Sequence, residues 1–495
     1  METRNSRASI LVEIQVTWFK RDFRLADNAA LSAAARKGPV LPLFIYEPES
    51  WAQPDRSGRQ DDFMRGALAS LKRDVVARGG AVSIRVGRVT SILEDLLEQF
   101  GHFALHAHEE TGNLWSFSRD EAVRRWCRNH KVSFTEYRQF GIERGGDTSR
   151  NGWAKRWDAM MEEPVLPEPP VIDWVLNTQD PLPPAKRDPG VSWVQAAGRG
   201  AAEAALHSFL RERGEFYQKD MSTPVAGETA CSRISPHLVW GSMSMREMFQ
   251  ATVARQNELR EGPVEDRGFW LKSLNSFVGR LHWHCHFSQK LEDQPDLETT
   301  AMIPAYDALR ESNAERLERY ATGHTGFPFV DACMRYLAAN GWINFRMRAM
   351  LVSFASYDLW LPWQESGHVL ARLFTDYDAG IHWPQVQMQS GVTGINTIRV
   401  YSPVKQGLDQ DPTGDFTRYW VPELAHIPGK AVHELTSIEA MAANYPTPVI
   451  DHKEATRFAK DQIFALRRDP ELKAQAAAIM EKHGSRKRQP RRRRA

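Results

Sequence analysis

The stretch IQVTWF at residues 14–19, followed by DNAALSAAARK at 27–37 and VLPLFIY at 40–46, indicates the architecture of the N-terminal part of the chain. The two apolar runs have the length and the β-branched and aromatic content of strands, and the segment between them has helical periodicity. The same alternation continues, with strands expected at 81–87, 103–108 and 132–137 and helices at 61–80, 91–100 and 118–130. Such alternation produces βαβ units. The sequence therefore predicts an α/β domain over residues 11–145, with a Rossmann-like parallel sheet.

The rest of the chain predicts a linker and a second domain. A length of 495 residues is too great for one ordinary hydrophobic core. Residues 163–189 contain eight of the 28 prolines, which is typical of an extended connector, and we place the linker at 146–197. From 198 to 480 helical periodicity replaces the strand pattern. We therefore expect a large all-α domain there.

The basic charge of the chain is concentrated at its end. The net charge is +2, and seven of the 64 basic residues lie within 486–494. A basic tail at 484–495 is either a contact for nucleic-acid phosphates or a solvated, disordered segment without a specific partner, and the sequence does not distinguish the two. No run of 18 apolar residues and no secretory core occurs. We therefore expect no membrane segment and a cytoplasmic location.

The motifs argue against several classes of site. No G-x-G-x-x-G follows the first strand and no G-x-x-x-x-G-K-[ST] occurs, which disfavours a nicotinamide dehydrogenase and a P-loop NTPase. On a helix, His282 and His286 share one face while His284 points elsewhere, so too few ligands converge and we expect no metal site. The cysteines form no Cys-x-x-Cys pair and are expected to pack as small buried apolar groups: Cys127, Cys231, Cys285 and Cys333.

One candidate binding segment is the run Cys231-Ser-Arg-Ile-Ser-Pro-His-Leu238. Ser232 and Ser235 precede an expected helix, and Arg233 adds a cation. Hydroxyls, free backbone N–H groups and a guanidinium together suit a phosphate at the start of a helix. The alternative is a simple N-cap, which is commoner for such a segment taken alone.

A second candidate segment places two carboxylates two residues apart. Asp376 and Asp378 follow a helix that carries Arg346 and Arg348. A buried carboxylate facing a buried guanidinium would form a charge-assisted pair. The alternative is a surface turn in which each aspartate accepts hydrogen bonds from its own backbone.

Taken together, these segments resemble the photolyase/cryptochrome family of FAD-binding blue-light flavoproteins. The resemblance covers residues 16–424, and several motifs follow one another in the family's order and spacing. The first is Trp18-Phe-Lys-Arg-Asp-Phe-Arg-Leu-Ala-Asp-Asn28, close to the family's W-F-R-R-D-L-R-L-x-D-N. The others are Ser232–Leu238, Thr325–Arg335, Gly341-Trp342, Tyr401–Gly407, Asp411–Phe416 and Trp420–Leu424.

The resemblance implies a U-shaped FAD in the helical domain. Its phosphates would be held by Tyr217 and by the segment from Ser232 to Ser235. Cys231 occupies a position where the family usually has Thr. Arg348 and Asp376 match the ion pair beside the flavin ring. Further cofactor contacts are implied at Arg233, Ile234, Phe277, Arg280, His284, Tyr377 and Asp378.

Several positions depart from the family's repair site. His382 matches the Asn beside flavin N5. An unperturbed imidazole there would titrate near pH 6.5 and could change which redox state of the flavin is stable. The alternative is that the His382 ring serves merely as a neutral hydrogen-bond donor, as Asn would. Trp283 matches the Trp that stacks on a pyrimidine dimer, but Arg280 occupies the position where the family has Glu. Replacement of a carboxylate by a cation weakens the expectation of cyclobutane-dimer repair. Other replaced contacts are Phe345, Ala349 and Met388.

The expected electron relay is also altered. The family passes electrons to the flavin through three Trp residues, and the matching positions here are Val386, Trp363 and Tyr320, from the flavin outwards. The missing proximal indole should slow photoreduction by that route. Other indoles that could replace it are Trp342, Trp360 and Trp383, and the sequence does not rank them.

The function that the resemblance implies is blue-light-driven repair of pyrimidine photolesions by a lyase that binds damaged DNA. The alternative is a cryptochrome-like photoreceptor without repair activity. The N-terminal domain could hold an antenna pigment of folate or deazaflavin type near His108–Asn113, although that segment also reads as a loop and helix cap. We expect a monomer.

Overall fold

The computed structural model describes residues 13–145 and 150–484. Its N-terminal part contains five parallel strands in the order β3-β2-β1-β4-β5, as predicted for the α/β domain. The strands are β1 (Ile14–Phe19), β2 (Val40–Tyr46), β3 (Ser83–Val86), β4 (Phe103–His108) and β5 (Ser133–Tyr137). Four main helices connect them: α1 (Ala29–Lys37), α3 (Gly58–Val76), α4 (Val89–Phe100) and α5 (Leu114–His130), with the short α2 (Pro48–Trp51) after β2.

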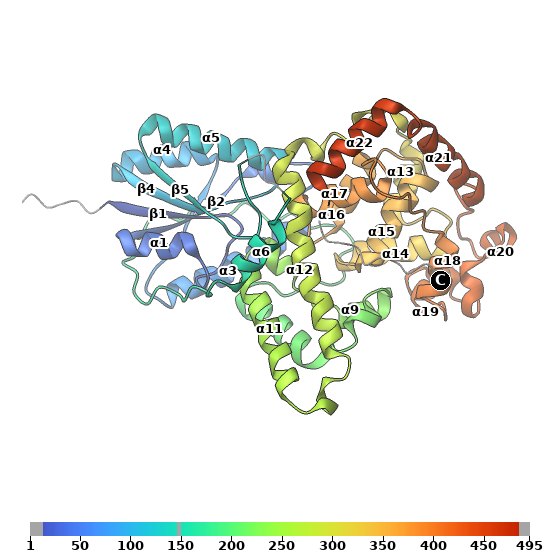
Figure 1. Ribbon diagram of the computed structural model, residues 1–495, viewed down its shortest axis with the longest axis horizontal. Helices are drawn as coiled ribbons and strands as arrows, with labels where there is room; N and C mark the ends of the chain where they lie inside the picture. The colour runs from blue at the N-terminus through green and yellow to red at the C-terminus, as the bar shows by residue number, and fades with distance from the viewer. Residues whose placement is uncertain (1–12, 146–149, 485–495) are drawn as a thin grey trace, which may run out of the picture.

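The helices cover both faces of the sheet (Figure 1). Val16 and Trp18 of β1 belong to the core that α4 and α5 close, whereas Phe19 belongs to the core with α1 and α3. Successive side chains of a strand point to opposite faces, so an apolar strand with helices on both sides is buried throughout. Because β1 pairs with both β2 and β4, the chain reverses its order there, and the carboxyl ends of β1 and β4 form the edge at which such sheets bind ligands.

The second part is helical, in agreement with the predicted all-α domain (Figure 1). Its helices begin with α7 (Arg199–Ser208), α8 (Tyr217–Asp220), α9 (Pro224–Ala230), α10 (Ser235–Val239), α11 (Met245–Glu261) and α12 (Trp270–Asp293). The series continues with α13 (Ala314–Thr322), α14 (Pro328–Asn340), α15 (Phe345–Ser353), α16 (Trp363–Leu373) and α17 (Ala379–Ser390). It ends with α18 (Pro403–Gln410), α19 (Asp415–Trp420), α20 (Ser437–Ala442), α21 (His452–Leu466) and α22 (Pro470–His483).

Helices α12 and α17 cross closely in the middle of this domain. A Cβ atom added to Gly380 would lie 2.7 Å from the Ser288 hydroxyl and 3.0 Å from its Cα atom. Glycine therefore allows the close approach of the two helices. Asp378 directly precedes α17, so this crossing holds Asp378 near His284 and Ser288 of α12.

The segment between the domains differs in part from the expected linker. Residues 153–162 form helix α6 (Trp153–Glu162), whose Trp153 and Trp157 pack with α11 and α12. The remaining proline-rich stretch is extended, and Val40 exchanges backbone hydrogen bonds with Asp173 and Val175. An amphipathic helix thus precedes the prolines, and its apolar face is buried in the helical domain.

The tail beyond Gly484 lies outside the described residues, so the expected disordered tail is not addressed by the structure. None of the described helices is long and apolar enough to cross a membrane. Three cysteines are buried, as expected, whereas Cys231 is only partly buried, and all four are free thiols.

Candidate functional site

The expected pair of Arg348 and Asp376 is present. Nη2 of Arg348, on α15, donates to both carboxylate oxygens of Asp376, at 3.0 and 2.9 Å. The Ser235 hydroxyl of α10 donates to the same carboxylate at 2.7 Å. Asp376 is buried, and the Arg348 side chain is 25% exposed. Three elements that are distant in sequence therefore meet at one charge-assisted cluster.

The neighbouring Asp378 has a different role. Its carboxylate accepts the Gly380 N–H at 2.9 Å and caps helix α17, which is the turn-like alternative considered for this segment. Tyr377 points to the other domain, where its hydroxyl donates to Asp55 at 2.7 Å. Burial and the Asp55 charge raise the pKa of Tyr377 well above its ordinary value. The three consecutive residues thus form an ion pair, an interdomain contact and a helix cap.

The serines at 232 and 235 do not cap α10. The helix begins at Ser235 without a side-chain cap, and the Ser235 hydroxyl bonds to Asp376 instead. Arg233 adopts a left-handed backbone conformation (φ +61°), and its guanidinium stacks 4.1 Å from the ring of Trp342 and 5.0 Å from that of Trp193. Its Nε and Nη2 atoms are buried and have no hydrogen-bond partner among the described residues. Such buried donors are rare unless a ligand or water satisfies them.

Four guanidinium groups surround this segment. Burial raises the pKa of the Cys231 thiol to about 11, while the cations of Arg233, Arg213, Arg280 and Arg348 oppose that rise. Arg213 donates to the backbone carbonyls of Thr229 and Ser232 at 2.7 Å each, and its Nε donates to the Ser208 hydroxyl at 2.9 Å. A carboxylate balances Arg348, so the site has excess positive charge. That excess suits the two negative charges of a dinucleotide pyrophosphate.

Aromatic and cationic side chains of α12 complete the site. Phe277 packs 6.4 Å from the ring of Tyr217, whose pKa rises to about 12 through burial. The Arg280 guanidinium lies 5.1 Å from the ring of Phe345, which is 44% exposed. The cation that replaces the expected carboxylate therefore lies beside an exposed aromatic ring. Ile234 is buried under the segment.

His382 is buried and neutral. Its Nε2 donates to the Gly367 carbonyl of α16 at 2.9 Å, so Nδ1 carries no proton in the neutral ring. Burial lowers the pKa of His382 to about 4. The titration near pH 6.5 expected of an unperturbed imidazole is therefore displaced below the physiological range.

The histidine run of α12 distributes over different surroundings. His282 and His286 both contact Trp153, with ring centroids 5.0 and 6.0 Å apart, whereas His284 lies 5.3 Å from Phe140. Among the described residues no cluster of three or more possible metal ligands occurs. Trp283 is 40% exposed, and its ring stacks 5.7 Å from that of Phe287.

The expected relay positions are all buried. Val386 is buried, and the Trp363 indole donates to Asp307 at 2.9 Å. Tyr320 is fully buried, and its hydroxyl donates to the Leu351 carbonyl at 3.1 Å. No local pattern in the sequence indicated the partner residues that hold these and other site groups, namely Asp55, Trp193, Asp307 and Gly367, because each comes from a distant element.

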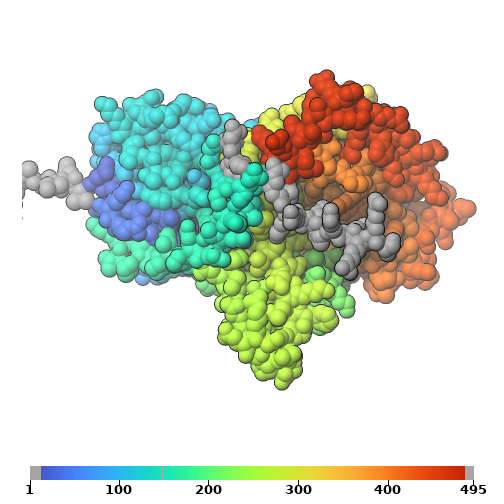
Figure 2. All heavy atoms as spheres, viewed as in Figure 1, coloured from blue at the N-terminus to red at the C-terminus, as the bar shows by residue number. Residues whose placement is uncertain are grey.

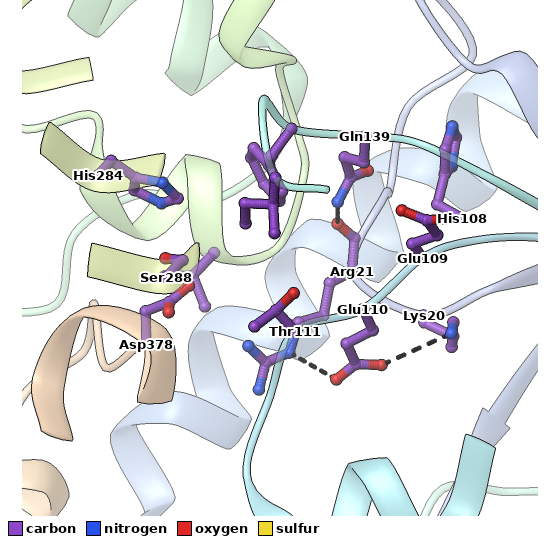
Figure 3. A pocket seen from close by; sticks show the side chains of 13 residues that line it. Lys20, Arg21, His108, Glu109, Glu110, Thr111, Gln139, His284, Ser288 and Asp378 are labelled. Atoms are coloured by element: carbon purple, nitrogen blue, oxygen red, sulfur yellow. Dashed lines mark hydrogen bonds and ion pairs between the residues drawn. The ribbon is translucent and has the colours of Figure 1, made fainter. Parts of the chain in front are cut away.

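A narrow pocket lies between the two domains, at the carboxyl edge of the sheet (Figure 3). Glu110 pairs there with Arg21 at 3.2 Å and with Lys20 at 4.0 Å, and His284, Ser288 and Asp378 line the opposite side. The cavity volume is about 20 Å³, which suits a water molecule rather than the fused rings of a pigment. Asn113 caps α5 by accepting from Ser116. Binding of an antenna pigment at this edge stays a prediction, and it would require this network to open.

Comparison with known proteins gives one consistent result. Residues 15–140 match the family described as DNA photolyase, and residues 277–465 match the FAD binding domain of DNA photolyase. The chain is 30% identical to the deoxyribodipyrimidine photo-lyase of Streptomyces griseus, over 90% of this chain and 98% of that protein. It is 28% identical to cryptochrome-2 of Arabidopsis thaliana, over 88% of this chain and 76% of that protein.

Solved structures show the same fold. A bacterial class III photolyase from Agrobacterium tumefaciens superposes with a TM-score of 0.79 at 23% identity, covering 94% of this chain and all of that one. A photolyase from Sulfolobus tokodaii, solved with two FAD molecules, superposes with a TM-score of 0.74 at 23% identity, covering 91% of this chain and all of that one.

The fold and site define a two-domain flavoprotein whose helical domain binds FAD. The chain belongs to the photolyase/cryptochrome family.

Proposed function

We propose that this protein is a light-driven DNA photolyase that acts on pyrimidine photolesions. The observation that supports this proposal best is the cluster of Arg348, Asp376 and Ser235, which joins helices α15 and α10 to the turn before α17 around one buried carboxylate. Two relatives, 30% and 27% identical to this chain, are named deoxyribodipyrimidine photo-lyase. The chemistry that FAD supplies when bound is light-driven transfer of one electron to the lesion and its return after the ring opens.

Different residues of the chain would hold different parts of the cofactor. Arg233 and Arg213 would neutralise its phosphates, because both lie close enough to act on the Cys231 thiol. Arg348 and Asp376 would orient the flavin ring through donor and acceptor groups that are fixed by their mutual bonds. The unpartnered Nε and Nη2 of Arg233 provide donors already held in place by two indoles.

DNA is the partner that this function requires. The partly exposed indole of Trp283 would offer a stacking surface for a displaced base. The basic tail would add sequence-independent attraction to phosphates. We propose further that the protein acts as a monomer in the cytoplasm.

One observation favours a second candidate function, a cryptochrome-like photoreceptor. Arg280 stands where a carboxylate would contact the dimer, and its guanidinium lies over the Phe345 ring. A cation cannot accept the hydrogen bonds that a carboxylate accepts. Cryptochromes are also among the relatives, at 28% and 27% identity.

Illumination of the purified protein, chemically reduced, with oligonucleotides that carry a cyclobutane dimer or a (6-4) lesion distinguishes the two candidates. Repair of either lesion is the expected result, and loss of repair in Trp283→Ala would locate the reaction. Phe269→Ala is the matched control, because Phe269 is 55% exposed and lies at the start of α12, on the arm of α11 and α12 that projects from the molecule (Figure 2). Absence of repair of both lesions would favour the photoreceptor.

A further inference from the structure

The relay through the helical domain lacks an indole at Val386, and another indole lies one helical turn away. Trp383 and Val386 are three residues apart on α17, so their side chains lie on the same side of the helix. The Trp383 ring is fully buried, with its centroid 5.9 Å from that of Trp363 on α16. Trp383 also precedes Val386 and is therefore nearer to the start of α17 at Ala379, which follows Asp376 by three residues.

The space for this indole comes from two small residues. A Cβ atom on Gly367 would lie 2.6 Å from Cζ3 of Trp383 and 3.5 Å from Val386. Gly367 is four residues after Trp363, on the same face of α16. The absence of a Cβ at 367 and the short side chain at 386 together let the indole of Trp383 lie against α16, in contact with Trp363.

A contiguous series of side chains connects Trp383 to the flavin site. Arg348, the partner of Asp376, lies 4.1 Å from the Phe374 ring, and Phe374 lies 6.0 Å from His382. The His382 ring is 4.9 Å from that of Trp383. Because electron tunnelling slows steeply with distance, ring-to-ring contact along such a series favours Trp383 as the donor nearest the flavin.

The charges around each indole distinguish the three alternatives that the sequence leaves open. A guanidinium lies 4.1 Å from the ring of Trp342 and another lies 4.6 Å from the ring of Trp360, and both oppose removal of an electron from the indole. Trp383 faces His382 and His368 instead, each with its ring at 4.9 Å. Burial lowers the pKa of both histidines, so both rings are uncharged near neutral pH.

Trp363 has a proton acceptor beside its indole, as the outermost electron donor of a relay requires. Its Nε1 donates to the Asp307 carboxylate at 2.9 Å, and Asp307 is only partly buried. An oxidised indole is a strong acid, and a carboxylate in hydrogen-bond contact both stabilises its positive charge and accepts its proton. The Tyr320 hydroxyl donates to a backbone carbonyl, which cannot accept a proton, and Tyr320 has no exposed surface. Tyr320 is therefore unsuited as the outer member of a relay.

We propose that Trp383 and Trp363 form a two-indole electron donor to the flavin, with Asp307 as the proton acceptor of Trp363. One electron leaves Trp383 for the light-excited oxidised flavin, and Trp363 then reduces the oxidised Trp383. The oxidised Trp363 gives its Nε1 proton to Asp307. A thiolate in solution returns one electron to Trp363 and becomes a thiyl radical, Asp307 returns the proton to Trp363, and two thiyl radicals combine as a disulfide. The inference rests on the flavin site of the proposed function.

The test uses the full-length protein loaded with FAD, illuminated with blue light in the presence of dithiothreitol. Trp383→Phe and Trp363→Phe are each expected to slow photoreduction by about tenfold or more. Asp307→Asn keeps a hydrogen-bond acceptor but cannot accept the proton, so the indole radical seen by transient absorption should decay faster and photoreduction should fall. Trp126→Phe, which changes a buried indole of α5 in the other domain, is the matched control and should photoreduce like the wild type.

Flavin content, the fluorescence lifetime of the bound flavin and the thermal midpoint are measured for each variant. A longer flavin fluorescence lifetime in Trp383→Phe supports direct donation by Trp383. If Trp383→Phe folds poorly, Trp383→Tyr keeps an aromatic ring and should still photoreduce more slowly than the wild type. Wild-type photoreduction in Trp383→Phe, or loss of photoreduction in Trp360→Phe or Tyr320→Phe alone, would overturn the proposal. Lesion repair by chemically reduced wild-type protein is assayed separately, because its absence contradicts the proposed function and leaves the relay test intact.

Discussion

The hydroxyl of Ser235 donates a 2.7 Å hydrogen bond to Asp376, whose two carboxylate oxygens also accept hydrogen bonds from Arg348. Asp376→Ala should lower the free energy of unfolding by about 2–4 kcal/mol, because it leaves the Arg348 charge without its partner. This range lies below that of a fully buried pair, since the Arg348 side chain is 25% exposed. The variant should also retain little FAD. Urea unfolding and the ratio of flavin to protein absorbance measure the two effects.

Asp378→Asn is the matched control for this prediction. Asp378 is two residues away and bears the same side chain, but it caps α17 through the Gly380 N–H, and asparagine is an equally good N-cap. We expect its stability to change by less than about 0.5 kcal/mol. Equal losses in the 376 and 378 variants would contradict a special role for the Arg348 pair.

Ser235→Ala tests the third member of the cluster. It removes one hydrogen bond to a charged acceptor, which should cost about 1.5–3 kcal/mol, and it leaves the ion pair in place. FAD affinity, measured by fluorescence titration of the apoprotein, should fall with stability. Ser232→Ala is the comparison, and a larger effect at 232 than at 235 would show that the cofactor depends on the other hydroxyl.

The sequence predicts the two domains well because their signals are local. Apolar runs such as 14–19 and 40–46 have the same bounds in the structure, and the helical periodicity after residue 198 marks the second domain. Helix α6 was missed because its ten residues adjoin the proline-rich stretch, whose composition dominates the signal. The prolines begin only after its last turn.

The candidate site is less predictable, because its partners are distant in sequence. The pairing of Arg348 with Asp376 follows from the resemblance, whereas the contact of Tyr377 with Asp55 joins two domains and has no sequence signature. Electrostatic surroundings are equally hidden. The low pKa of His382 comes from its burial among three aromatic rings, which outweighs the opposing effect of the hydrogen bond to the Gly367 carbonyl.

That low pKa predicts acid sensitivity. The unfolded chain binds a proton at His382 near pH 6.5, and the folded chain binds it only near pH 4. Below pH 6.5 the unfolded state therefore binds more protons, so the stability associated with the neutral ring is complete above pH 6.5 and is lost as the pH falls towards 4. The loss is about 3 kcal/mol at most for this group. Burial lowers the pKa of His106 and His237 to about 4 as well, and they add to the same slope.

His382→Asn should reduce this dependence in urea unfolding measured from pH 8 to pH 4. His207→Asn is the control, because it makes the same substitution at a histidine whose side chain is 68% exposed. The visible spectrum of the bound flavin should not respond to His382 between pH 5.5 and 8.5, since the ring is neutral throughout. A spectral transition near pH 6.5 that disappears in His382→Asn would contradict the burial of this ring.

The position of Trp383 can be tested in the protein without cofactor, through Gly367. In a helix interior, alanine is favoured over glycine by about 1 kcal/mol. At Gly367, however, the added Cβ would lie 2.6 Å from Trp383, and such overpacking costs about 1–3 kcal/mol. Gly367→Ala should therefore destabilise the protein, whereas Gly279→Ala on α12, where the added Cβ meets nothing within 4 Å, should stabilise it.

In the background of Trp383→Leu, which removes the indole, Gly367→Ala should become neutral or stabilising. The coupling energy from this double-mutant cycle, measured by urea unfolding of the apoprotein, should be about 1–3 kcal/mol. Additive effects, or stabilisation by Gly367→Ala alone, would show that the indole of Trp383 does not lie against α16.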